Sequence, residues 1–276
     1  MKKTVFDIHD LQNVIPIFKK KFFAFWGKKL LKWLSFEKVN TIHSNNCHFV
    51  GSEFTSAILA DPMMDVKYII HHEDRLDSLP KEGAFITVSN HPSGSLEGII
   101  LIDIFASRRK DFKVMVNEML EKIGALAGNW ISVLPNTGDR TKGNQANIGG
   151  VKATLGWLKA GHPMGFFPAG AMSFKDKDRK VKDRPWTQSI IRLIRKARVP
   201  VYPVLFDFQN SRLFYWLGKI SWKIRTLRCP EEAFNKRGKT VDIHIGRPIS
   251  PETIQQYTDD AELADFLYRA TYDSYL

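Results

Sequence analysis

Residues 83–105 read GAFITVSNHPSGSLEGIILIDIF, and this pattern settles the class of fold. Residues 83–89 predict a short buried strand, because aromatic and β-branched side chains occur there without a charge. The apolar run 99–105 predicts a helix. A strand that passes through a turn into a helix is the building unit of an α/β protein. The turn carries His91, and Glu97 follows just before the helical run.

The same alternation of short β-rich and helical runs continues through the middle of the chain. Further strands are predicted at 113–117, 131–134, 164–167, 200–207 and 240–245. Helices are predicted at 97–107, 118–126, 147–160, 186–197 and 251–274. This order predicts an α/β fold in which a mixed sheet is covered by helices, with functional sites at the carboxyl ends of the strands.

His91 and Glu97 are the predicted catalytic residues. A neutral imidazole takes a proton from a hydroxyl near pH 7, and a carboxylate fixes its tautomer and stabilises the imidazolium that forms. Backbone N–H groups at Ser93 and Gly94 would stabilise developing negative charge at the helix start. These residues predict acid/base chemistry suited to acyl transfer to an alcohol. The alternative is a hydrogen-bonded turn with no chemical role.

Composition favours an anionic partner. The 276 residues include 41 Lys and Arg against 29 Asp and Glu, a net charge of +12. Such an excess suits nucleic acid, an anionic membrane surface, or an acidic carrier or substrate. The length of 276 residues suits one large α/β domain with an appendage, or two small domains, and an apolar fraction of 43% is enough for a full core. Cys47 and Cys229 suggest neither a disulfide framework nor a metal site, which predicts a reducing, cytoplasmic setting.

Residues 15–34 combine large aromatic side chains with lysines on the other side of a predicted helix. An interfacial helix needs this combination, because aromatic rings lie at the headgroup level and lysines reach anionic phosphates. We therefore predict a basic amphipathic helical segment over residues 1–45 that docks on a membrane. The alternative is a helix packed on the domain with its lysines in water. The predicted membrane-contact residues are Phe18, Phe22, Trp26 and Trp33.

Membrane contact is expected to be peripheral or monotopic. No uncharged apolar run approaches the roughly 18 residues that span a bilayer. The chain begins like an export signal, but Asp7, His9 and Asp10 interrupt the apolar region, so we expect no exported leader. Residues 211–228 form a second basic stretch, with five Lys or Arg and no acid. Core packing and membrane contact explain its apolar stripe equally well, a stripe formed by Leu217, Ile220, Ile224 and Leu227.

A second turn that could approach a ligand lies at residues 166–173, which read FFPAGAMS. A strand again runs into Pro and Gly, whose backbone leaves room for a ligand. The basic run 175–184 that follows predicts either a solvated loop or a lid that receives an anionic head group or carrier. Arg140 could hold a phosphate or carboxylate, or could be an ordinary loop arginine. The predicted substrate-binding residues are Ser93, Gly94, Arg140, Pro168, Ala169, Gly170 and Ser173.

Taken in order, these segments resemble the glycerolipid acyltransferase family over residues 65–250. That family has an Asn-His-x4-Asp motif at a strand end, a Phe-Pro-Glu-Gly-Thr-Arg-Ser motif, a Val-Pro-x-x-Pro-Val strand and an Ile-Gly-x-Pro-Ile turn. The matching residues are Asn90-His91 with Glu97, then 167–173, 199–204 and 245–249.

Three departures resemble the hemolysin-like branch of that family, which includes ornithine- and glycine-lipid O-acyltransferases. The acid is Glu97, one position later than the family's Asp, and Ala169 and Met172 replace a Glu and an Arg associated with glycerol phosphate. The sequence DRPW at 183–186 is also similar to that branch. The family's second motif has no full match, and Arg140 is only a nearby substitute.

The resemblance implies transfer of a fatty acyl group from an acyl carrier protein or coenzyme A thioester to a lipid hydroxyl, with no further cofactor and no metal. His91 would deprotonate the hydroxyl, Glu97 would orient His91, and N–H groups near Ser93 and Gly94 would hold the oxyanion. An acyltransferase domain over residues 46–276 would lie at the cytoplasmic face of the inner membrane. Met172 in place of Arg favours a lyso-aminolipid acceptor, and lysophosphatidate is the alternative.

Two competing interpretations remain at this point. A non-catalytic basic protein that binds membranes or nucleic acid fits the net charge, but it gives His91 and Glu97 no role. The second interpretation is that His91 and Glu97 hydrolyse a thioester instead of transferring its acyl group. A Gly-x-Ser-x-Gly elbow and a phosphate-binding Gly-x-x-x-x-Gly-Lys-Ser/Thr loop are absent from the sequence. We therefore expect neither a serine nucleophile nor a nucleotide, and no nucleic acid partner.

Overall fold

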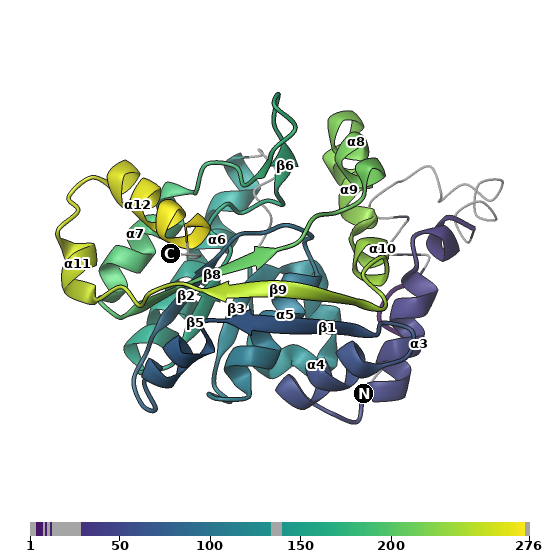
Figure 1. The fold of residues 1–276 in the computed structure, drawn as a ribbon, viewed down its shortest axis with the longest axis horizontal. Helices are drawn as coiled ribbons and strands as arrows, with labels where there is room; N and C mark the ends of the chain where they lie inside the picture. The colour runs from purple at the N-terminus through teal and green to yellow at the C-terminus, as the bar shows by residue number, and fades with distance from the viewer. Residues whose placement is uncertain (1–3, 8, 10–11, 13–28, 134–139, 274–276) are drawn as a thin grey trace.

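A computed structural model describes residues 4–7, 9, 12, 29–133 and 140–273. A seven-stranded sheet forms the centre of this part of the chain (Figure 1). Its strands are β1 (Val66–His71), β2 (Ile86–Ser89), β3 (Lys113–Asn117), β4 (Trp130–Val133), β5 (Met164–Phe166), β8 (Val201–Asp207) and β9 (Lys239–Ile245).

The strand order is β1-β9-β8-β2-β5-β3-β4. In the described residues every neighbouring pair of this sheet is parallel except β8 and β9. The predicted mixed sheet is therefore confirmed. β2 lies in the middle, where Ile86 pairs with Met164 of β5 and with Val201 of β8. All four residues of β2 are buried, as a strand covered on both faces requires.

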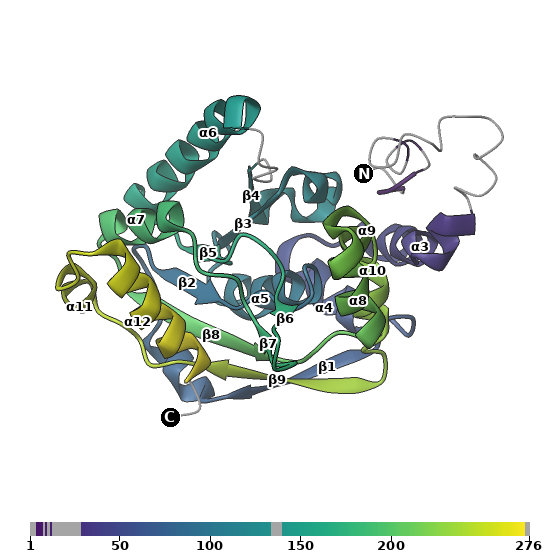
Figure 2. The same ribbon diagram turned by 90° about the horizontal axis from the view of Figure 1, so that it is seen from above.

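Helices cover both faces of the sheet and make three layers (Figure 2). On one face lie α4 (Gly51–Ala60) and α5 (Leu96–Ala106), and on the other lie α7 (Gln188–Ala197), α11 (Pro251–Gln255) and α12 (Asp260–Tyr272). The remaining helices are α3 (Phe36–Asn46), α6 (Arg140–Lys159), α8 (Arg212–Ile220), α9 (Trp222–Leu227) and α10 (Cys229–Phe234), with 3-10 turns η2 (Glu73–Ser78), η3 (Glu118–Lys122) and η4 (Gly124–Asn129).

Three of the predicted helices differ from the structure. The segment 118–126 forms η3 and η4 instead of an α-helix, because glycine-bearing tight turns return the chain to β4 within a few residues. The helix predicted at 147–160 begins earlier, at Arg140. The predicted helix 251–274 is two helices, because the Asp259 side chain accepts a hydrogen bond from Ala261 N at 2.6 Å and starts α12 afresh.

The basic segment 211–228 is also divided. The helix stops at Ile220 and restarts at Trp222, with Ser221 extended between α8 and α9. The predicted stripe is consequently split, since Leu217 and Leu227 are buried whereas Ile220 and Ile224 are exposed. Strand β1 and helix α4 were not among the predicted elements, whereas α3 lies almost wholly in the helical segment predicted over residues 1–45.

The N-terminal part is tied to the domain through α3. Backbone N–H groups of Val5 and Phe6 donate to Asn40 Oδ1 at 2.9 and 3.0 Å. α3 crosses the predicted division at residue 45 and packs on α4. Phe18, Phe22 and Trp26 lie outside the described residues, and the amphipathic segment stays a prediction. Of the helices that the structure describes, none is both long enough and apolar enough to span a bilayer.

Candidate active site

The site is built where three parallel strands end. β2, β5 and β8 are parallel neighbours, so their carboxyl ends meet at one edge of the sheet. β2 leads directly to Asn90 and His91, β5 leads to Phe167 and Pro168, and β8 leads to the turn that holds Asn210. Turns that lie far apart in the sequence are thereby brought together.

Two asparagines hold the turn that carries His91. The side-chain amide of Asn90 donates to Phe206 O at 3.0 Å and its carbonyl accepts from Phe206 N at 2.8 Å, which extends the pairing of β2 with β8. Asn210 Nδ2 donates to Pro92 O at 2.8 Å. Both asparagines are buried, so these bonds fix the backbone on either side of His91.

His91 and Glu97 are in contact. Nδ1 of His91 lies 2.9 Å from Oε1 of Glu97. At this distance the carboxylate charge acts directly on the imidazole. The His91 ring stacks on Phe167, with 4.4 Å between centroids, and its side chain is 21% exposed.

Glu97 is fully buried and ionised. Burial alone would raise the pKa of Glu97, but the contact with His91 and the hydroxyl and backbone donors of the turn outweigh it and lower the pKa to about 2. Ser93 N and Gly94 N donate to Oε1 at 2.8 and 2.7 Å, and the Ser93 hydroxyl donates to Oε2. The carboxylate thus holds the turn that immediately precedes α5.

This arrangement corrects one predicted role. The N–H groups of Ser93 and Gly94 were expected to hold an oxyanion, but both donate to Glu97. The N–H groups of Ser95 and Leu96 point to the Ser93 hydroxyl oxygen, at 3.3 and 3.1 Å. The amides of Ser93 and Gly94 therefore stabilise the carboxylate, and those of Ser95 and Leu96 bind the Ser93 hydroxyl.

The pair is arranged to act as a base. A carboxylate beside Nδ1 favours the proton on that nitrogen and leaves the lone pair on Nε2. Among the residues that the structure describes, Nε2 of His91 has no partner. A hydroxyl that reaches Nε2 can therefore lose its proton there while Glu97 stabilises the resulting imidazolium.

Asp183 belongs to the site, although no role for it was predicted from the sequence. Its Oδ1 accepts from the Ser173 hydroxyl at 2.5 Å and from His91 N at 3.2 Å. Ser173 N in turn donates to His91 O at 2.8 Å. Burial raises the pKa of Asp183, and these hydrogen bonds offset part of that effect. The DRPW sequence contained Asp183, but only the fold shows that it lies behind His91.

The remaining predicted binding residues form the turn after β5. Pro168 and Ala169 are buried, Gly170 is exposed with φ of +60°, and the Ser173 side chain is buried. Pro168 O accepts from the backbone N and the hydroxyl of Thr187, at 2.9 and 3.0 Å. Ser173 therefore positions the His91 turn, and Gly170 is the member of this set most open to a ligand.

The two turns touch each other directly. Gly94 has φ of +81°, and a Cβ there would lie 2.5 Å from Met172 Sδ and 3.1 Å from Cys229 Sγ. Met172 and Cys229 are buried with Phe214 and Tyr215 of α8. The turn after β2, the turn after β5 and α8 thus pack as one unit.

Arg225 of α9 supports the second turn from the other side. Its side chain is buried, and it donates to Ser173 O at 3.2 Å and to Met172 O at 3.5 Å. The guanidinium also lies over the Phe214 ring, 5.4 Å from its centroid. Arg225 is therefore a cation fixed beside the turn in which Met172 stands.

The predicted basic loop is a short hairpin. β6 (Phe174–Lys175) and β7 (Val181–Lys182) pair antiparallel, and Lys182 lies 2.8 Å from Asp176. Arg140 is the first residue of α6, and its side chain lies outside the described part of the chain. The anion-binding role of Arg140 stays a prediction.

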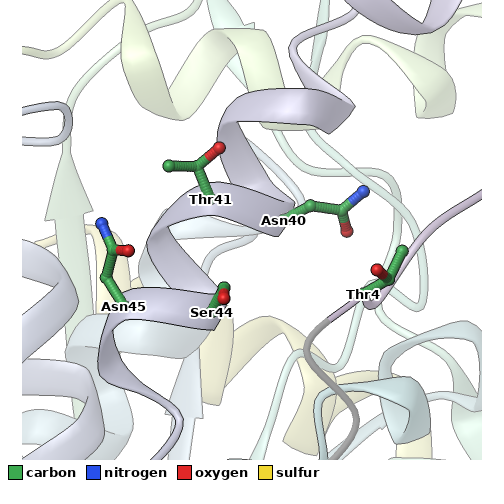
Figure 3. A pocket seen from close by; sticks show the side chains of 5 residues that line it. All are labelled: Thr4, Asn40, Thr41, Ser44 and Asn45. Carbon is green, nitrogen blue, oxygen red and sulfur yellow. The ribbon is translucent and has the colours of Figure 1, made fainter.

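Elsewhere in the described part of the chain, no metal-binding cluster is found, and the pocket beside α3 is lined by neither a base nor a reactive nucleophile. Within the described ranges, no group of three or more His, Cys, Asp or Glu side chains is placed to hold a metal ion. A pocket of about 270 Å³ lies away from His91, beside α3 (Figure 3). It is lined by Thr4, Asn40, Thr41, Ser44 and Asn45, side chains that supply neither a base nor a nucleophile of ordinary reactivity.

A histidine beside an ionised carboxylate at the carboxyl ends of parallel strands is an arrangement suited to taking a proton from a substrate. The family model described as Acyltransferase matches residues 11–275, and the chain belongs to this family. The resemblance drawn from the motifs is thereby confirmed, and the protein is an acyl-transferring enzyme.

Two relatives carry the name lyso-glycine lipid O-acyltransferase. The one from Bacteroides thetaiotaomicron is 28% identical over 262 residues, which cover 91% of this chain and 89% of the relative. The one from Phocaeicola vulgatus is 26% identical over 243 residues, with coverages of 86% and 82%. The crystal structure of the 1-acyl-sn-glycerophosphate acyltransferase PlsC from Thermotoga maritima has a TM-score of 0.49 at 16% identity, covering 81% of this chain and 80% of its own.

Proposed function

We propose that this enzyme transfers a fatty acyl group from a thioester to the hydroxyl of a lyso-aminolipid of the glycine-lipid kind. The contact of His91 with the ionised Glu97 carries the proposal, because it supplies the base that an alcohol acceptor needs. The names of the relatives support a lysolipid as the acceptor. The donor would be acyl carrier protein or coenzyme A, whose thioester is already activated.

The reaction needs one base and no covalent enzyme intermediate. Nε2 of His91 takes the hydroxyl proton as the acceptor oxygen attacks the thioester carbonyl carbon. The C–O bond forms, the C–S bond breaks, and the proton on Nε2 passes to the leaving thiolate. The products are an ester and a free thiol, and His91 returns to its neutral state. Glu97 keeps the ring oriented and stabilises its charged form.

The turn after β5 favours an acceptor without a glycerol phosphate group. Met172, which stands where the resembling family has an arginine, is buried against Cys229 and presents no charge. Since thioester donors are cytoplasmic and lysolipids lie in bilayers, we place the enzyme at the cytoplasmic face of the inner membrane, as a peripheral or monotopic protein.

The test is a purified reaction analysed by mass spectrometry. The enzyme is given acyl carrier protein or coenzyme A thioesters together with lyso-glycine lipid, lyso-ornithine lipid or lysophosphatidate. We expect an acylated aminolipid, and we expect His91→Ala to lower the rate by about 10²- to 10⁴-fold. A matched control is His162→Ala, since His162 also pairs with a carboxylate, Asp111 at 2.7 Å, but belongs to another part of the fold.

Other results would overturn parts of the proposal. Turnover of lysophosphatidate alone would replace the acceptor. Free fatty acid formed at the same rate with and without acceptor would make the enzyme a hydrolase. Full activity of His91→Ala would remove His91 from the mechanism.

A further inference from the structure

The outer face of α8 and α9 is apolar and exposed. Among the described residues nine large apolar side chains are exposed, and five of these belong to the two helices. The five are Leu213, Trp216, Ile220, Trp222 and Ile224, whereas Trp33, Phe49, Val50 and Ile69 lie elsewhere. The exposed fractions of Trp216, Ile220 and Trp222 are 56%, 57% and 52%. We name this set of five the α8–α9 face.

The α8–α9 face is distinct from the core-facing side of the same helices. Phe214 and Leu217 of α8 are buried, whereas Leu213, Trp216 and Ile220 follow the i, i+3, i+7 spacing of one outward stripe. Five exposed apolar side chains on two consecutive helices are costly in water, and such a concentration marks an interaction surface.

The charge around the α8–α9 face identifies the partner. Arg212, Lys219 and Lys223 are exposed on the same two helices, and residues 211–228 contain no acid. Lys223 Nζ lies 5.9 Å from the centroid of the Trp222 ring. Tryptophans and aliphatic side chains bordered by cations match the boundary of an anionic bilayer, where rings sit at headgroup depth and cations meet phosphates.

The position of this face relative to the site favours the same partner. Phe214 and Tyr215, on the inner side of α8, pack on Met172 and Cys229 of the catalytic unit. The β6–β7 hairpin and the α8–α9 pair project on the same side of the molecule (Figures 1 and 2). Lys175 of the hairpin lies 5.0 Å from the Tyr215 ring centroid. A bilayer on the α8–α9 face would therefore lie one helix away from His91.

Trp33, a predicted membrane-contact residue, contacts the end of α9. The guanidinium of Arg228, which links α9 to α10, lies 4.6 Å from the centroid of the Trp33 ring. Trp33 is half-exposed. Two segments with aromatic side chains and cations thus meet side by side, although the sequence separates them widely.

We propose that the α8–α9 face docks on an anionic lipid bilayer and holds the site above it, so that a lysolipid reaches His91 from the membrane. This inference rests on the proposed function for the nature of the acceptor. Docking itself is independent of which acceptor is used.

Vesicle binding by the full chain tests the proposal. Wild type is compared with the triple variant Trp216→Ser, Ile220→Ser, Trp222→Ser by flotation with vesicles of phosphatidylcholine and about 30% phosphatidylglycerol. We expect the variant to lose at least about tenfold in vesicle affinity. The matched control is Val50→Ser with Ile69→Ser, which removes apolar side chains of 57% and 52% exposure elsewhere and should bind as wild type does.

A second variant tests the charge. Replacing Arg212, Lys219 and Lys223 by Gln should weaken binding to these vesicles by about 100-fold and binding to pure phosphatidylcholine much less, as about fivefold per surface cation predicts. Both variants should keep wild-type activity on a short-chain lysolipid dispersed in detergent. If wild type has no activity on that substrate, the proposed function is contradicted. The docking proposal is then tested by the vesicle-binding result alone.

Three outcomes would overturn the docking proposal. The triple variant could bind vesicles as wild type does. It could lose thermal stability without lipid, which would mean that the chain itself covers this face. It could convert a wild-type dimer into a monomer, which would make a second copy the occupant.

Discussion

At the scale of single residues, the site depends on a carboxylate that is buried and charged at once. Glu97 gains three donors from its own turn and the contact with His91, and these outweigh the cost of its burial. The sequence supplied both residues of this pair, because a His-x5-Glu spacing across a strand end is local. Which acceptor the N–H groups of Ser93 and Gly94 bind could not be predicted, because it depends on the conformation of the folded turn.

The lowered pKa of Glu97 predicts how stability changes with pH. The folded value of about 2 lies below the ordinary 4.5, so the ionised carboxylate stabilises the fold above pH 4.5 and this contribution disappears as pH falls toward 2. At about 1.4 kcal/mol per pKa unit, the contribution is about 3 kcal/mol.

Urea unfolding of wild type and Glu97→Gln across this pH range measures that contribution. The difference in unfolding free energy between the two proteins should shrink as pH falls, while other carboxyl groups cancel in the comparison. A difference that stays constant between pH 7 and pH 3 would contradict the assigned pKa.

Asp183 should behave as a positioning residue. Removing its oxygens with Asp183→Ala frees Ser173 and the His91 backbone, and displacement of the base by about 1 Å lowers kcat by about 10²-fold. KM should change little, because Asp183 is buried and its hydrogen bonds go to Ser173 and the His91 backbone. Asp183→Asn keeps a carbonyl oxygen toward both donors, and we expect it to retain most of the activity. Equal losses of kcat in both variants would argue that the charge of Asp183 matters instead.

At the scale of elements, the contact of the two turns decides whether the site forms. Gly94 and Met172 come from the turns after β2 and β5, and their close approach leaves no space for a side chain at position 94. The individual turns were predictable from Pro, Gly and short apolar runs. Their contact was not, because it depends on β2 and β5 becoming neighbours in the sheet.

Alanine at two glycines separates this contact from backbone strain. Gly83 has φ of +85° and no atom within 4 Å of the place that a Cβ would occupy, so Gly83→Ala should cost about 1 kcal/mol in stability and leave activity intact. Gly94→Ala has the same strain plus the overlap with Met172 and should cost at least about 2 kcal/mol more. It should also lower activity, and adding Met172→Ala should restore part of both. Equal effects at the two positions would show that the turns do not press together.

Several elements could not be predicted, for identifiable reasons. β1 pairs with β9, which comes from the far end of the chain, so no local pattern reports its partner. Residues 211–228 carry a continuous helical pattern, and the break at Ser221 depends on how α8 and α9 pack on the domain. Six of the sheet's seven strands, all but β1, were predicted nearly in full because buried strands are short apolar runs.

At the scale of the whole molecule, the pattern of residues along the chain predicts the fold, whereas the net charge predicts the kind of binding partner. The α/β class followed from alternating patterns along the chain, and the structure confirms it. The charge of +12 carries no information on the fold but bears on the partners. Strand order, and with it the grouping of three strand ends, required the complete sheet.

The net charge predicts how the rate with an acidic carrier depends on salt. With acyl carrier protein as donor, raising ionic strength from about 0.05 to 0.5 M should lower kcat/KM by about tenfold, because screening weakens the attraction of opposite charges. The matched control is an acyl-pantetheine, which carries the same thioester without charge and should show little change. Equal salt dependence of both donors would argue against an electrostatic role of the basic surface.

The turn that carries His91 is held by Phe206, Asp183 and Asn210, which lie 92 to 118 positions along the chain from their hydrogen-bond partners in that turn. Contacts of such long range form slowly, since loop closure must precede them. Recovery of activity after dilution from denaturant should therefore lag behind recovery of helix content. A partly assembled chain would hold the histidine and the glutamate yet remain inert, so catalysis in this protein reports that folding is complete.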